Sequence, residues 1–226
     1  MKTVVITGAS RGIGRALAER FLANGDSVIG SSRTGQADFQ DSNLRILPME
    51  LTDDASRQRF ADTVRDLNRP IDIFINNAGM WHDNDEGPVV DLEALRQTLE
   101  ADLVGPVDLA QKLVSLMAPG SHIINVSSRR GSCSFTEDKS DQPPGRCLVD
   151  PAYSIAKAGL NMFTRKLAVR LKDKATVSSV HPGSVKTDMN PGGEITSQEA
   201  AEDIFKLANS SPETGQFWFK GEKFSW

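Results

Sequence analysis

The sequence predicts an α/β fold in which helices cover both faces of a mostly parallel sheet of seven strands. Short runs rich in β-branched residues alternate with longer stretches of helical periodicity along the whole chain. Several strand candidates, such as residues 71–75, are almost entirely apolar, as is typical of strands buried on both faces. The 226 residues contain no repeat, linker or low-complexity tract, so we expect one domain over residues 1–226.

The expected elements follow one another in a regular order. The first strand ends at a glycine-rich turn that begins the first helix. The last strand carries alternating aromatic residues, Phe217 and Phe219, and we expect them to form the core of an edge strand with Phe224 and Trp226. The expected strands are Val4–Thr7, Ser27–Ser31, Leu44–Pro48, Ile71–Asn76, His122–Ser127, Thr176–His181 and Phe217–Phe219. The expected helices are Gly12–Asn24, Asp53–Asn68, Leu92–Met117, Pro151–Lys172 and Ser197–Ala208.

Composition and charge exclude several classes of protein. The 26 basic and 30 acidic residues give a formal charge of −4, and no basic block is present, so nucleic-acid binding is disfavoured. The mean hydropathy is −0.34 and the chain opens on a strand-like segment, so we expect no membrane span, no signal peptide and a cytoplasmic location. The two cysteines, Cys133 and Cys147, provide no metal cluster, and we expect reduced thiols.

Three glycines lie where the first strand should pass into the first helix. Gly8 allows a sharp turn, Gly12 lets the backbone approach a pyrophosphate, and Gly14 permits close packing of helix on strand. The free N–H groups at the start of the helix would face the anion. The spacing, T-G-x-x-x-G-x-G, differs from the generic dinucleotide pattern, and glycines at such a turn are often structural. It nevertheless favours a Rossmann-type, doubly wound fold that binds a dinucleotide.

The end of the second expected strand indicates which dinucleotide is bound. An acidic residue at this place usually binds the free ribose 2′-hydroxyl of NAD, but residues 31–34 contain none. Arg33, together with Arg11, could instead hold a 2′-phosphate, because guanidinium groups match phosphate geometry. NADP(H) is therefore favoured over NAD(H). The alternative is that both arginines only cover the surface.

A candidate catalytic pair lies at the start of the fourth expected helix. Tyr153, the single tyrosine, precedes Lys157 by four residues, and Asp150 followed by Pro151 is typical of a helix start, so the two side chains should share one helical face. An ammonium beside a phenol stabilises the phenolate and eases proton exchange with a carbonyl oxygen. Such a pair alone is weak evidence, but Ser128 ends a neighbouring strand at the same edge of the sheet, where its hydroxyl could bind the same oxygen.

Together these segments resemble the short-chain dehydrogenase/reductases with a single Rossmann-type domain, and the resemblance covers nearly the whole chain. Its motifs are TGASRGIG at 7–14, NNAG at 76–79, INVSS at 124–128, YSIAK at 153–157 and HPGSVKT at 181–187. TDMNPGG at 187–193 and the ending GQFWFKGEKFSW are similar to the sniffer-like and C-factor-like carbonyl reductases of that family.

The resemblance implies roles for individual residues. Tyr153 is the acid/base, Lys157 tunes it and holds the nicotinamide ribose, and Ser128 positions the carbonyl. The implied NADP(H)-binding residues are Gly8, Ser10, Arg11, Gly12, Ile13, Gly14, Ser32, Arg33, Glu50, Leu51, Asn77, Ala78, Gly79, Tyr153, Lys157, Pro182, Gly183, Val185 and Thr187. Asn76 and Ser127 are interpreted as structural, because polar residues at strand ends usually satisfy backbone groups.

Two features depart from the pattern of the family. The position of its fourth catalytic residue, an Asn that supports a proton relay to the Lys, carries Asp102 here. A carboxylate accepts hydrogen bonds but cannot donate them, and near Lys157 it would raise the pKa of the ammonium, so we expect an intact site with an altered relay. The second departure is an insertion at residues 131–150, which we expect beside the catalytic mouth, where Phe135 could cover the substrate or the loop could change subunit packing.

The sequence says less about the substrate than about the cofactor. Met80, Trp81, His82 and Met189 could form an apolar substrate wall or belong to the core, and His181 is interpreted as packing. The favoured function is reduction of an aldehyde, ketone or quinone by NADPH, with a small-molecule carbonyl or alcohol as partner. The alternatives are a nucleotide-binding regulatory or signalling protein with little turnover, and a reductase dedicated to one metabolite such as a pterin.

The resemblance also bears on assembly. Family members often pair between subunits through the helices that correspond to Leu92–Met117 and Pro151–Lys172, which allows a homodimer or a homotetramer. The insertion at residues 131–150 leaves the choice between them open.

Overall fold

The computed structural model describes residues 1–81, 90–134 and 151–226, and its described residues form an open eight-stranded sheet. The spatial order is β3-β2-β1-β4-β5-β6-β7-β8, and all neighbouring strands are parallel except β7 and β8. The strands are β1 (Thr3–Ile6), β2 (Ser27–Ser32), β3 (Leu44–Pro48), β4 (Ile71–Asn76), β5 (Met117–Val126), β6 (Ala175–Val180), β7 (Gln216–Phe219) and β8 (Glu222–Lys223). The predicted doubly wound, mostly parallel α/β fold is confirmed.

The sheet has one strand more than the seven predicted. A turn at Lys220 and Gly221, both with positive φ, returns the chain so that the two-residue β8 pairs antiparallel with β7. Two exposed polar residues carry no strand pattern, which is why the sequence did not reveal β8. Beyond it, Trp226 stacks on the buried ring of Phe217 with 5.5 Å between ring centroids, as expected for an aromatic edge-strand core.

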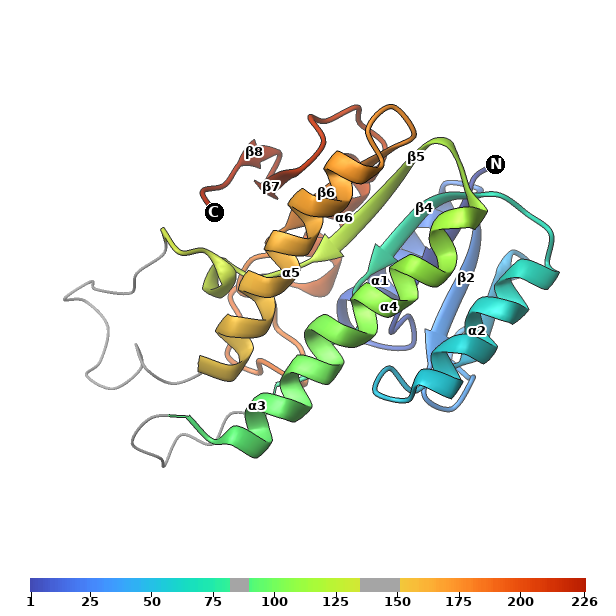
Figure 1. The fold of residues 1–226 in the computed structure, drawn as a ribbon. Helices are drawn as coiled ribbons and strands as arrows, with labels where there is room; N and C mark the ends of the chain where they lie inside the picture. Colours follow the sequence, from blue (N-terminus) through green and yellow to red (C-terminus); the bar gives the residue numbers. More distant parts are fainter. Residues whose placement is uncertain (82–89, 135–150) are drawn as a thin grey trace.

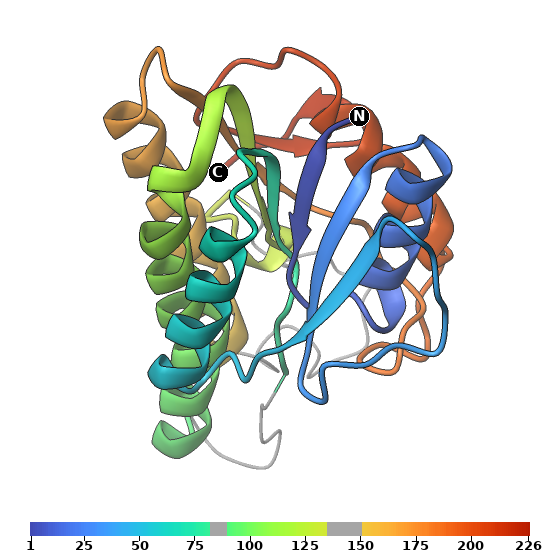
Figure 2. The same cartoon turned by 90° about the vertical axis from the view of Figure 1, so that its right-hand side faces the viewer.

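Helices cover both faces of the sheet (Figures 1 and 2). The face that carries α1 and α6 is opposite the face that carries α2, α4 and α5. The α-helices are α1 (Gly12–Ala23), α2 (Asp54–Asp66), α3 (Leu92–Leu99), α4 (Gly105–Leu113), α5 (Pro151–Arg170) and α6 (Ser197–Ala208). Side chains of Asp53, Asp91 and Thr196 accept backbone N–H groups at the starts of α2, α3 and α6, which fixes where those helices begin.

The apolar strands explain why both faces are covered. Successive side chains of a strand point to opposite faces, so Val4 and Ile6 of β1 join the core beneath α1 and α6, while Val5 joins the core beneath α2, α4 and α5. All three side chains are fully buried. A strand in this position needs helices on both sides, which is what the almost continuous apolar runs of the sequence predict.

The long helix expected over residues 92–117 is interrupted. Between α3 and α4 lies one turn of π-helix, η1 (Glu100–Val104), in which the Gly105 N–H bonds to the carbonyl of Glu100, five residues earlier. Pro106 explains the break, because it has no N–H to donate to the carbonyl of Asp102 and its ring would clash with that carbonyl in a regular helix. The chain then passes through a 3₁₀ turn, η2 (Val114–Leu116), and enters β5 at Met117, earlier than predicted.

The strand order determines where a ligand can bind. The chain moves outward from β1 through β2 to β3 and then returns to β4 on the other side of β1, so the order reverses between β1 and β4. In open α/β sheets, ligands bind at such a reversal, beyond the carboxyl ends of the strands. Among residues 1–81, 90–134 and 151–226, no helix combines the length and apolar character needed to cross a bilayer.

Candidate active site

The glycine-rich turn between β1 and α1 forms a shallow backbone cradle. Gly8 and Gly12 both adopt positive φ, at +69° and +56°. Gly14 cannot carry a side chain, because a Cβ there would lie 2.1 Å from the carbonyl oxygen of Gly8. Arg11, the residue just before α1, makes no side-chain hydrogen bond to the helix. The first N–H groups of α1 are therefore not capped by that side chain, and they lie at the positive end of the helix. This arrangement fits the pyrophosphate of a dinucleotide.

Two neighbouring strand ends hold the cradle in place. The hydroxyl of the buried Thr7 accepts the N–H groups of Asn77 and Ala78, each at 2.9 Å, and the Asn77 amide donates to the Thr7 carbonyl at 2.9 Å. On the other side, the Gly8 N–H donates to the hydroxyl of Ser31 at 3.1 Å. Ser31, which was not predicted as a site residue, therefore braces the turn.

Two further predicted cofactor residues, Ser32 and Glu50, lie at the ends of the neighbouring strands β2 and β3. The side chain of Ser32 accepts the Gln36 N–H at 3.0 Å, so its hydroxyl is engaged within its own loop, and Met49 donates its N–H to the Ser32 carbonyl. The Glu50 carboxylate accepts the hydroxyl of Thr52 at 3.0 Å. The Met49–Ser32 bond connects the ends of β2 and β3, whereas the other two bonds each lie within one loop.

The segment after β6 approaches the cradle from the opposite direction. Thr187 lies close to Gly12, since a Cβ on that glycine would be 3.5 Å from the Thr187 methyl carbon. The Arg11 guanidinium bonds to Asp188 at 2.9 Å, with both side chains largely exposed. Arg11 is thus paired with Asp188, whereas the exposed Arg33 has no such ion pair among the described residues. The clamp of Arg11 and Arg33 on a 2′-phosphate stays a prediction.

The predicted catalytic side chains Asp102, Lys157 and Tyr153 are brought together by η1 and α5. The Lys157 Nζ lies 3.1 Å from Asp102 Oδ2, in an ion pair whose angles are not those of a hydrogen bond, and 5.3 Å from the centroid of the Tyr153 ring. The Lys157 ammonium also donates to the Val126 carbonyl at 3.4 Å. Lys157 and Asp102 are both buried, whereas Tyr153 is half-buried.

The electrostatics of this cluster keep the ammonium charged. Burial opposes a charge on Lys157 and by itself lowers its pKa, but the negative charges of the Asp102 carboxylate and of Tyr153 in its phenolate form outweigh that effect and raise the pKa of Lys157 above its usual value. This is the direction expected from the sequence for an Asp at position 102.

Asp102 also connects the cluster to the segment after β4. Its second carboxylate oxygen accepts the Met80 N–H at 2.7 Å. The interruption of the helix at η1 therefore places one buried carboxylate between Lys157 and the loop that follows the Asn77–Gly79 segment. π-helical turns occur frequently at functional sites. Neither the turn nor the Met80 contact was predicted, although Pro106 signals the break.

Ser128 lies at the end of β5 and is placed by the first turns of α5. Its hydroxyl accepts the Arg130 N–H at 3.3 Å and so caps a short 3₁₀ turn, η3 (Arg129–Gly131). Gly131 packs directly on the backbone of Lys157, where a Cβ would be 2.6 Å from the carbonyl carbon. The neighbouring hydroxyl of Ser127 donates to the Lys157 carbonyl at 3.4 Å, which is the structural role expected for it.

Of the further candidates, Trp81 lies near Tyr153. The Trp81 ring centroid is 6.4 Å from that of Tyr153, and Trp81 and Met189 are both exposed, at 40% and 41%. Phe135, the rest of the insertion to residue 150, His82 and Cys147 lie outside the described residues, so the predictions about them stay predictions. Arg129 and Arg130 were not predicted as site residues.

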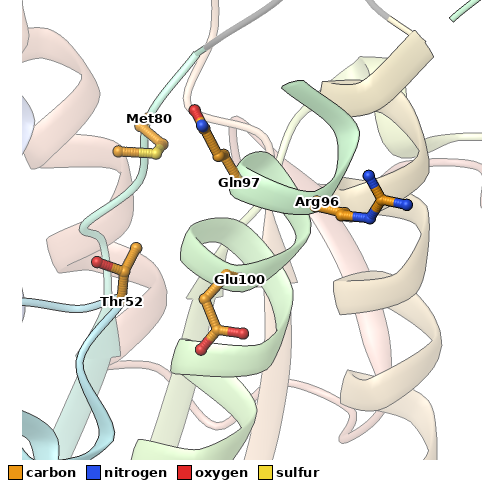
Figure 3. Close-up of a pocket in the computed structure, with 5 residues that line it drawn as sticks. All are labelled: Thr52, Met80, Arg96, Gln97 and Glu100. Carbon is orange, nitrogen blue, oxygen red and sulfur yellow. The ribbon is translucent and has the colours of Figure 1, made fainter. Parts of the chain in front are cut away.

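A hollow of about 460 Å³ lies beside the predicted cofactor segments (Figure 3). It is bordered by the loop after β3, the loop after β4, and α3 with η1, and its lining residues are Thr52, Met80, Arg96, Gln97 and Glu100. Gln97 faces Met80, whereas the guanidinium of Arg96 extends away toward α5. None of these five residues belongs to the predicted cofactor set, although Thr52 follows Leu51 and Met80 follows Gly79.

His181 was interpreted as a packing residue, and the structure agrees. Its ring stacks on Phe219 with 4.8 Å between centroids. Burial, with a smaller contribution from the charge of Arg129, lowers the pKa of His181 to about 4. The imidazole is therefore neutral at physiological pH and has no proton to donate there.

The strand order and the glycine cradle at its reversal place the chain among the dinucleotide-binding α/β proteins. More particularly, it belongs to the short-chain dehydrogenases, whose family model matches residues 2–198. It is therefore a member of a family of oxidoreductases.

Individual relatives are similar over most of the chain. It is 32% identical over 196 residues to the 3-oxoacyl-[acyl-carrier-protein] reductase FabG of Escherichia coli, a match that covers 83% of this chain and 75% of the relative. It is 33% identical to an uncharacterized short-chain type dehydrogenase/reductase, y4vI, of Sinorhizobium fredii, of which it spans only 33%.

Solved structures show the same fold. The carbonyl reductase Sniffer of D. melanogaster aligns over 100% of both chains with a TM-score of 0.86 and 25% identity, in line with the sniffer-like resemblance of the sequence. A short-chain dehydrogenase/reductase of Burkholderia multivorans, solved with bound NADP, aligns over 100% of this chain and 99% of its own with a TM-score of 0.86 and 24% identity.

Proposed function

We propose that the protein reduces a carbonyl compound by hydride transfer from NADPH, with Tyr153 as the proton donor. The observation that carries this proposal is the buried ammonium of Lys157, held charged by Asp102 and located 5.3 Å from the Tyr153 ring. A fixed positive charge beside a phenol stabilises the phenolate that forms when the phenol gives up its proton. The pair is therefore suited to general acid catalysis at a carbonyl oxygen.

Each side chain has a distinct task in this proposal. The nicotinamide ring supplies the hydride that adds to the carbonyl carbon. Ser128 donates a hydrogen bond that orients the carbonyl, and Tyr153 gives its proton to the oxygen as negative charge develops there. Lys157 binds the nicotinamide ribose hydroxyls and stabilises the phenolate left on Tyr153. Asp102 acts through Lys157, as a positioning residue.

The cofactor would extend along the carboxyl ends of the strands. The cradle of Gly8, Gly12 and Gly14 at the start of α1 would hold its pyrophosphate, because backbone N–H groups and the helix dipole favour an anion there. We assign the adenine end to the Glu50–Leu51 segment, the central riboses to residues 77–79, and the carboxamide end to residues 182–187. The same set includes Ser10 and Ile13 in the cradle.

NADP(H) is preferred over NAD(H) in this proposal. The β2 end carries no carboxylate that would bind a free 2′-hydroxyl or repel a 2′-phosphate. Arg11 is bound to Asp188 in an exposed ion pair, a type of contact worth only about 0–1 kcal/mol, so a phosphate can replace it at little cost. The relative solved with NADP is consistent with this preference. The Michaelis constants for NADPH and NADH test it, and a lower constant for NADH would contradict it.

Replacement of Tyr153 by phenylalanine tests the catalytic assignment. We expect kcat for a carbonyl substrate to fall by about 100- to 10,000-fold, the usual contribution of general acid catalysis, while NADPH binding is kept. NADPH oxidation against a panel of aldehydes, ketones and quinones measures it. Undiminished reduction by the variant would overturn the mechanism. A wild-type protein that binds NADPH but reduces no member of the panel would favour the regulatory alternative.

The assembly prediction gains a physical basis from the exposed helix faces. Val104 of η1, and Ile155, Met162 and Val169 of α5, are large apolar residues with 44–76% exposure. Exposed apolar side chains on α5 and on the adjacent turn η1 favour a second copy of the chain as their partner. We propose a homodimer or homotetramer through these helices, and light scattering coupled to size exclusion tests it.

A further inference from the structure

The short turn η3 follows Ser128 directly and is bonded to it in two ways. The Ser128 carbonyl accepts the Gly131 N–H at 3.0 Å, and the Ser128 hydroxyl accepts the Arg130 N–H at 3.3 Å. The Ser132 N–H closes the turn by donating to the Arg129 carbonyl at 3.0 Å. The place of the Ser128 hydroxyl therefore depends on what holds residues 129–132.

Helix α5 holds one side of this turn. Gly131 packs on the backbone of Lys157, where a Cβ would be 2.6 Å from the carbonyl carbon. The Gly131 carbonyl accepts the side-chain amide of the buried Asn161 at 3.0 Å. This side of η3 is thus fixed to the helix that carries Tyr153 and Lys157.

The other side of the turn is held by a segment far away in the sequence, Ser225–Trp226. The hydroxyl of the buried Ser132 donates to the Ser225 carbonyl at 2.8 Å. Ser134 donates both its N–H and its hydroxyl to the Trp226 carbonyl, each at 2.9 Å. Three hydrogen bonds therefore join residues 132–134 to a segment that was expected only to pack on an edge strand.

The Ser225–Trp226 segment is itself well anchored. The Trp226 ring stacks on the buried ring of Phe217 in β7, and the guanidinium carbon of Arg165 in α5 lies 5.5 Å from the Trp226 ring centroid. Just before this segment, the Phe224 N–H donates to the Phe217 carbonyl at 2.7 Å. The indole thus connects the edge of the sheet with α5 and supports the backbone that accepts the bonds from Ser132 and Ser134.

We infer that Ser132 and Trp226 are positioning residues of the reaction, because they hold the turn that determines where the Ser128 hydroxyl lies. The inference rests on the proposed function, in which that hydroxyl orients the substrate carbonyl. A displacement of about 1 Å at a reacting group can lower the rate of an enzyme considerably. In this assignment Ser132 and Trp226 contact neither substrate nor cofactor, and both act through Ser128.

Ser132→Ala removes the bond to the Ser225 carbonyl and is tested by steady-state kinetics with NADPH and a carbonyl substrate. We expect kcat to fall about three- to tenfold, the scale of one lost hydrogen bond, while the Michaelis constant for NADPH changes by less than about twofold. Ser132→Thr keeps the hydroxyl and should restore most of kcat. Ser210→Ala is the matched control, because the Ser210 hydroxyl also donates to a backbone carbonyl at 2.8 Å, beyond the end of α6. It should leave kcat unchanged.

A double-mutant cycle separates positioning from a general effect on stability. In the Ser128→Ala background the orienting hydroxyl is absent, so Ser132→Ala should change kcat by less than about twofold. Trp226→Ala, which leaves Ser132 intact, should also lower kcat only when Ser128 is present, and Trp226→Phe should restore kcat because it keeps a ring against Phe217. An undiminished kcat in Ser132→Ala, or equal losses in both backgrounds, would overturn the inference.

Hydrogen exchange tests the inference without turnover. The Arg130 N–H bonds to the Ser128 hydroxyl, so its exchange rate, measured by NMR, reports on that bond. We expect Ser132→Ala to raise this rate by at least about threefold, toward the rate in Ser128→Ala, and Ser210→Ala to leave it unchanged. An unchanged rate in Ser132→Ala would reject the positioning role. If the wild type reduces no carbonyl compound, the proposed function is rejected, and the exchange rate alone decides whether Ser132 holds Ser128 in place.

Discussion

The carboxylate of Asp102 is fully buried, and its two oxygens have different partners. One oxygen pairs with the Lys157 ammonium and the other accepts the Met80 N–H. An amide at this position, as in the family pattern, could accept the same N–H through its oxygen but would bring no charge to Lys157. The acid therefore changes the electrostatics of the site more than its geometry.

Asp102→Asn should lower the pKa of Lys157, because it removes the negative charge that most strongly offsets the effect of burial. We expect the alkaline limb of the kcat/KM profile for carbonyl reduction to move to lower pH by about one unit, because the neutral amine no longer stabilises the phenolate. The profile is measured from pH 6 to 10. Glu100→Gln, which neutralises a carboxylate of the same π-helical turn that pairs with Arg57, should leave the limb in place. An unchanged profile in Asp102→Asn would remove Asp102 from the proton pathway.

Gly14→Ala should prevent cofactor binding by displacing the cradle. The added methyl would lie 2.1 Å from the Gly8 carbonyl oxygen and 2.5 Å from the Asn77 side-chain amide, which is itself held by donating to the carbonyls of Thr7 at 2.9 Å and Gly8 at 3.4 Å. We expect the dissociation constant for NADPH, followed by fluorescence, to rise by at least about tenfold, equivalent to about 1.4 kcal/mol. Gly192→Ala places a methyl where no atom lies within 4 Å and should bind NADPH as the wild type does. Equal affinity in the two variants would contradict the assigned cradle.

At the scale of elements, a buried arginine connects α2 to the interrupted helix. Arg57, with a side chain only 4% exposed, bonds to Asp108 of α4 at 2.6 Å, to Glu100 of η1 at 3.2 Å and to the Leu51 carbonyl at 2.6 Å. It thus joins the loop after β3, the π-helical turn and α4. The helix that carries Asp102 is held partly by this contact.

Arg57→Ala should destabilise the fold strongly, since it removes the cation that pairs with Glu100, leaves Asp108 with Lys112 alone, and takes away the donor to the Leu51 carbonyl. We expect the free energy of unfolding in urea to fall by about 3–5 kcal/mol. Arg59→Ala is the matched control. Arg59 lies on the same helix and pairs with Asp53, but its side chain is 70% exposed. The free energy of unfolding should therefore fall by no more than about 1 kcal/mol. Similar losses in the two variants would show that Arg57 contributes no more than a surface charge.

The elements were largely predictable because their signals are local. Strands such as Leu44–Pro48 and Ile71–Asn76 match the predicted bounds, since an apolar run between turns leaves little choice. The interruption at η1 was not predicted, because the apolar periodicity continues through it. The one sign of it in the sequence is Pro106, which has no N–H to form a helical hydrogen bond. Similarly β8 exists because a turn folds it back on β7, which no property of its own two residues indicates.

The site was predictable only in part, for a related reason. Motif spacing predicted Tyr153 and Lys157 on one helical face, and the resemblance to the family implied that Asp102 would lie near the lysine. It could not show that Arg130 extends to Trp81 or that Arg11 pairs with Asp188, because those contacts depend on how separate loops meet in space.

At the scale of the whole molecule, two buried histidines couple folding to pH. His122 in β5 hydrogen-bonds to the Ser178 hydroxyl of β6 at 2.9 Å, and His181 follows β6. Burial lowers the pKa of each to about 4, with the charge of Arg129 a smaller cause at His181. An imidazole of the unfolded chain titrates near pH 6.5. Between these values the unfolded chain binds protons that the folded one does not.

Stability should therefore be complete above about pH 6.5 and fall as the pH decreases toward 4, by roughly 2 kcal/mol per histidine between pH 7 and 5. Urea unfolding at a series of pH values measures this slope. His122→Gln removes one titrating group from the sheet while keeping a polar side chain, and we expect it to be less stable at pH 7 but to lose about half as much stability on acidification as the wild type. If the free energy of unfolding falls with pH as steeply in the variant as in the wild type, His122 takes up its proton in the folded state. The assignment of a buried, neutral imidazole to His122 would then be wrong.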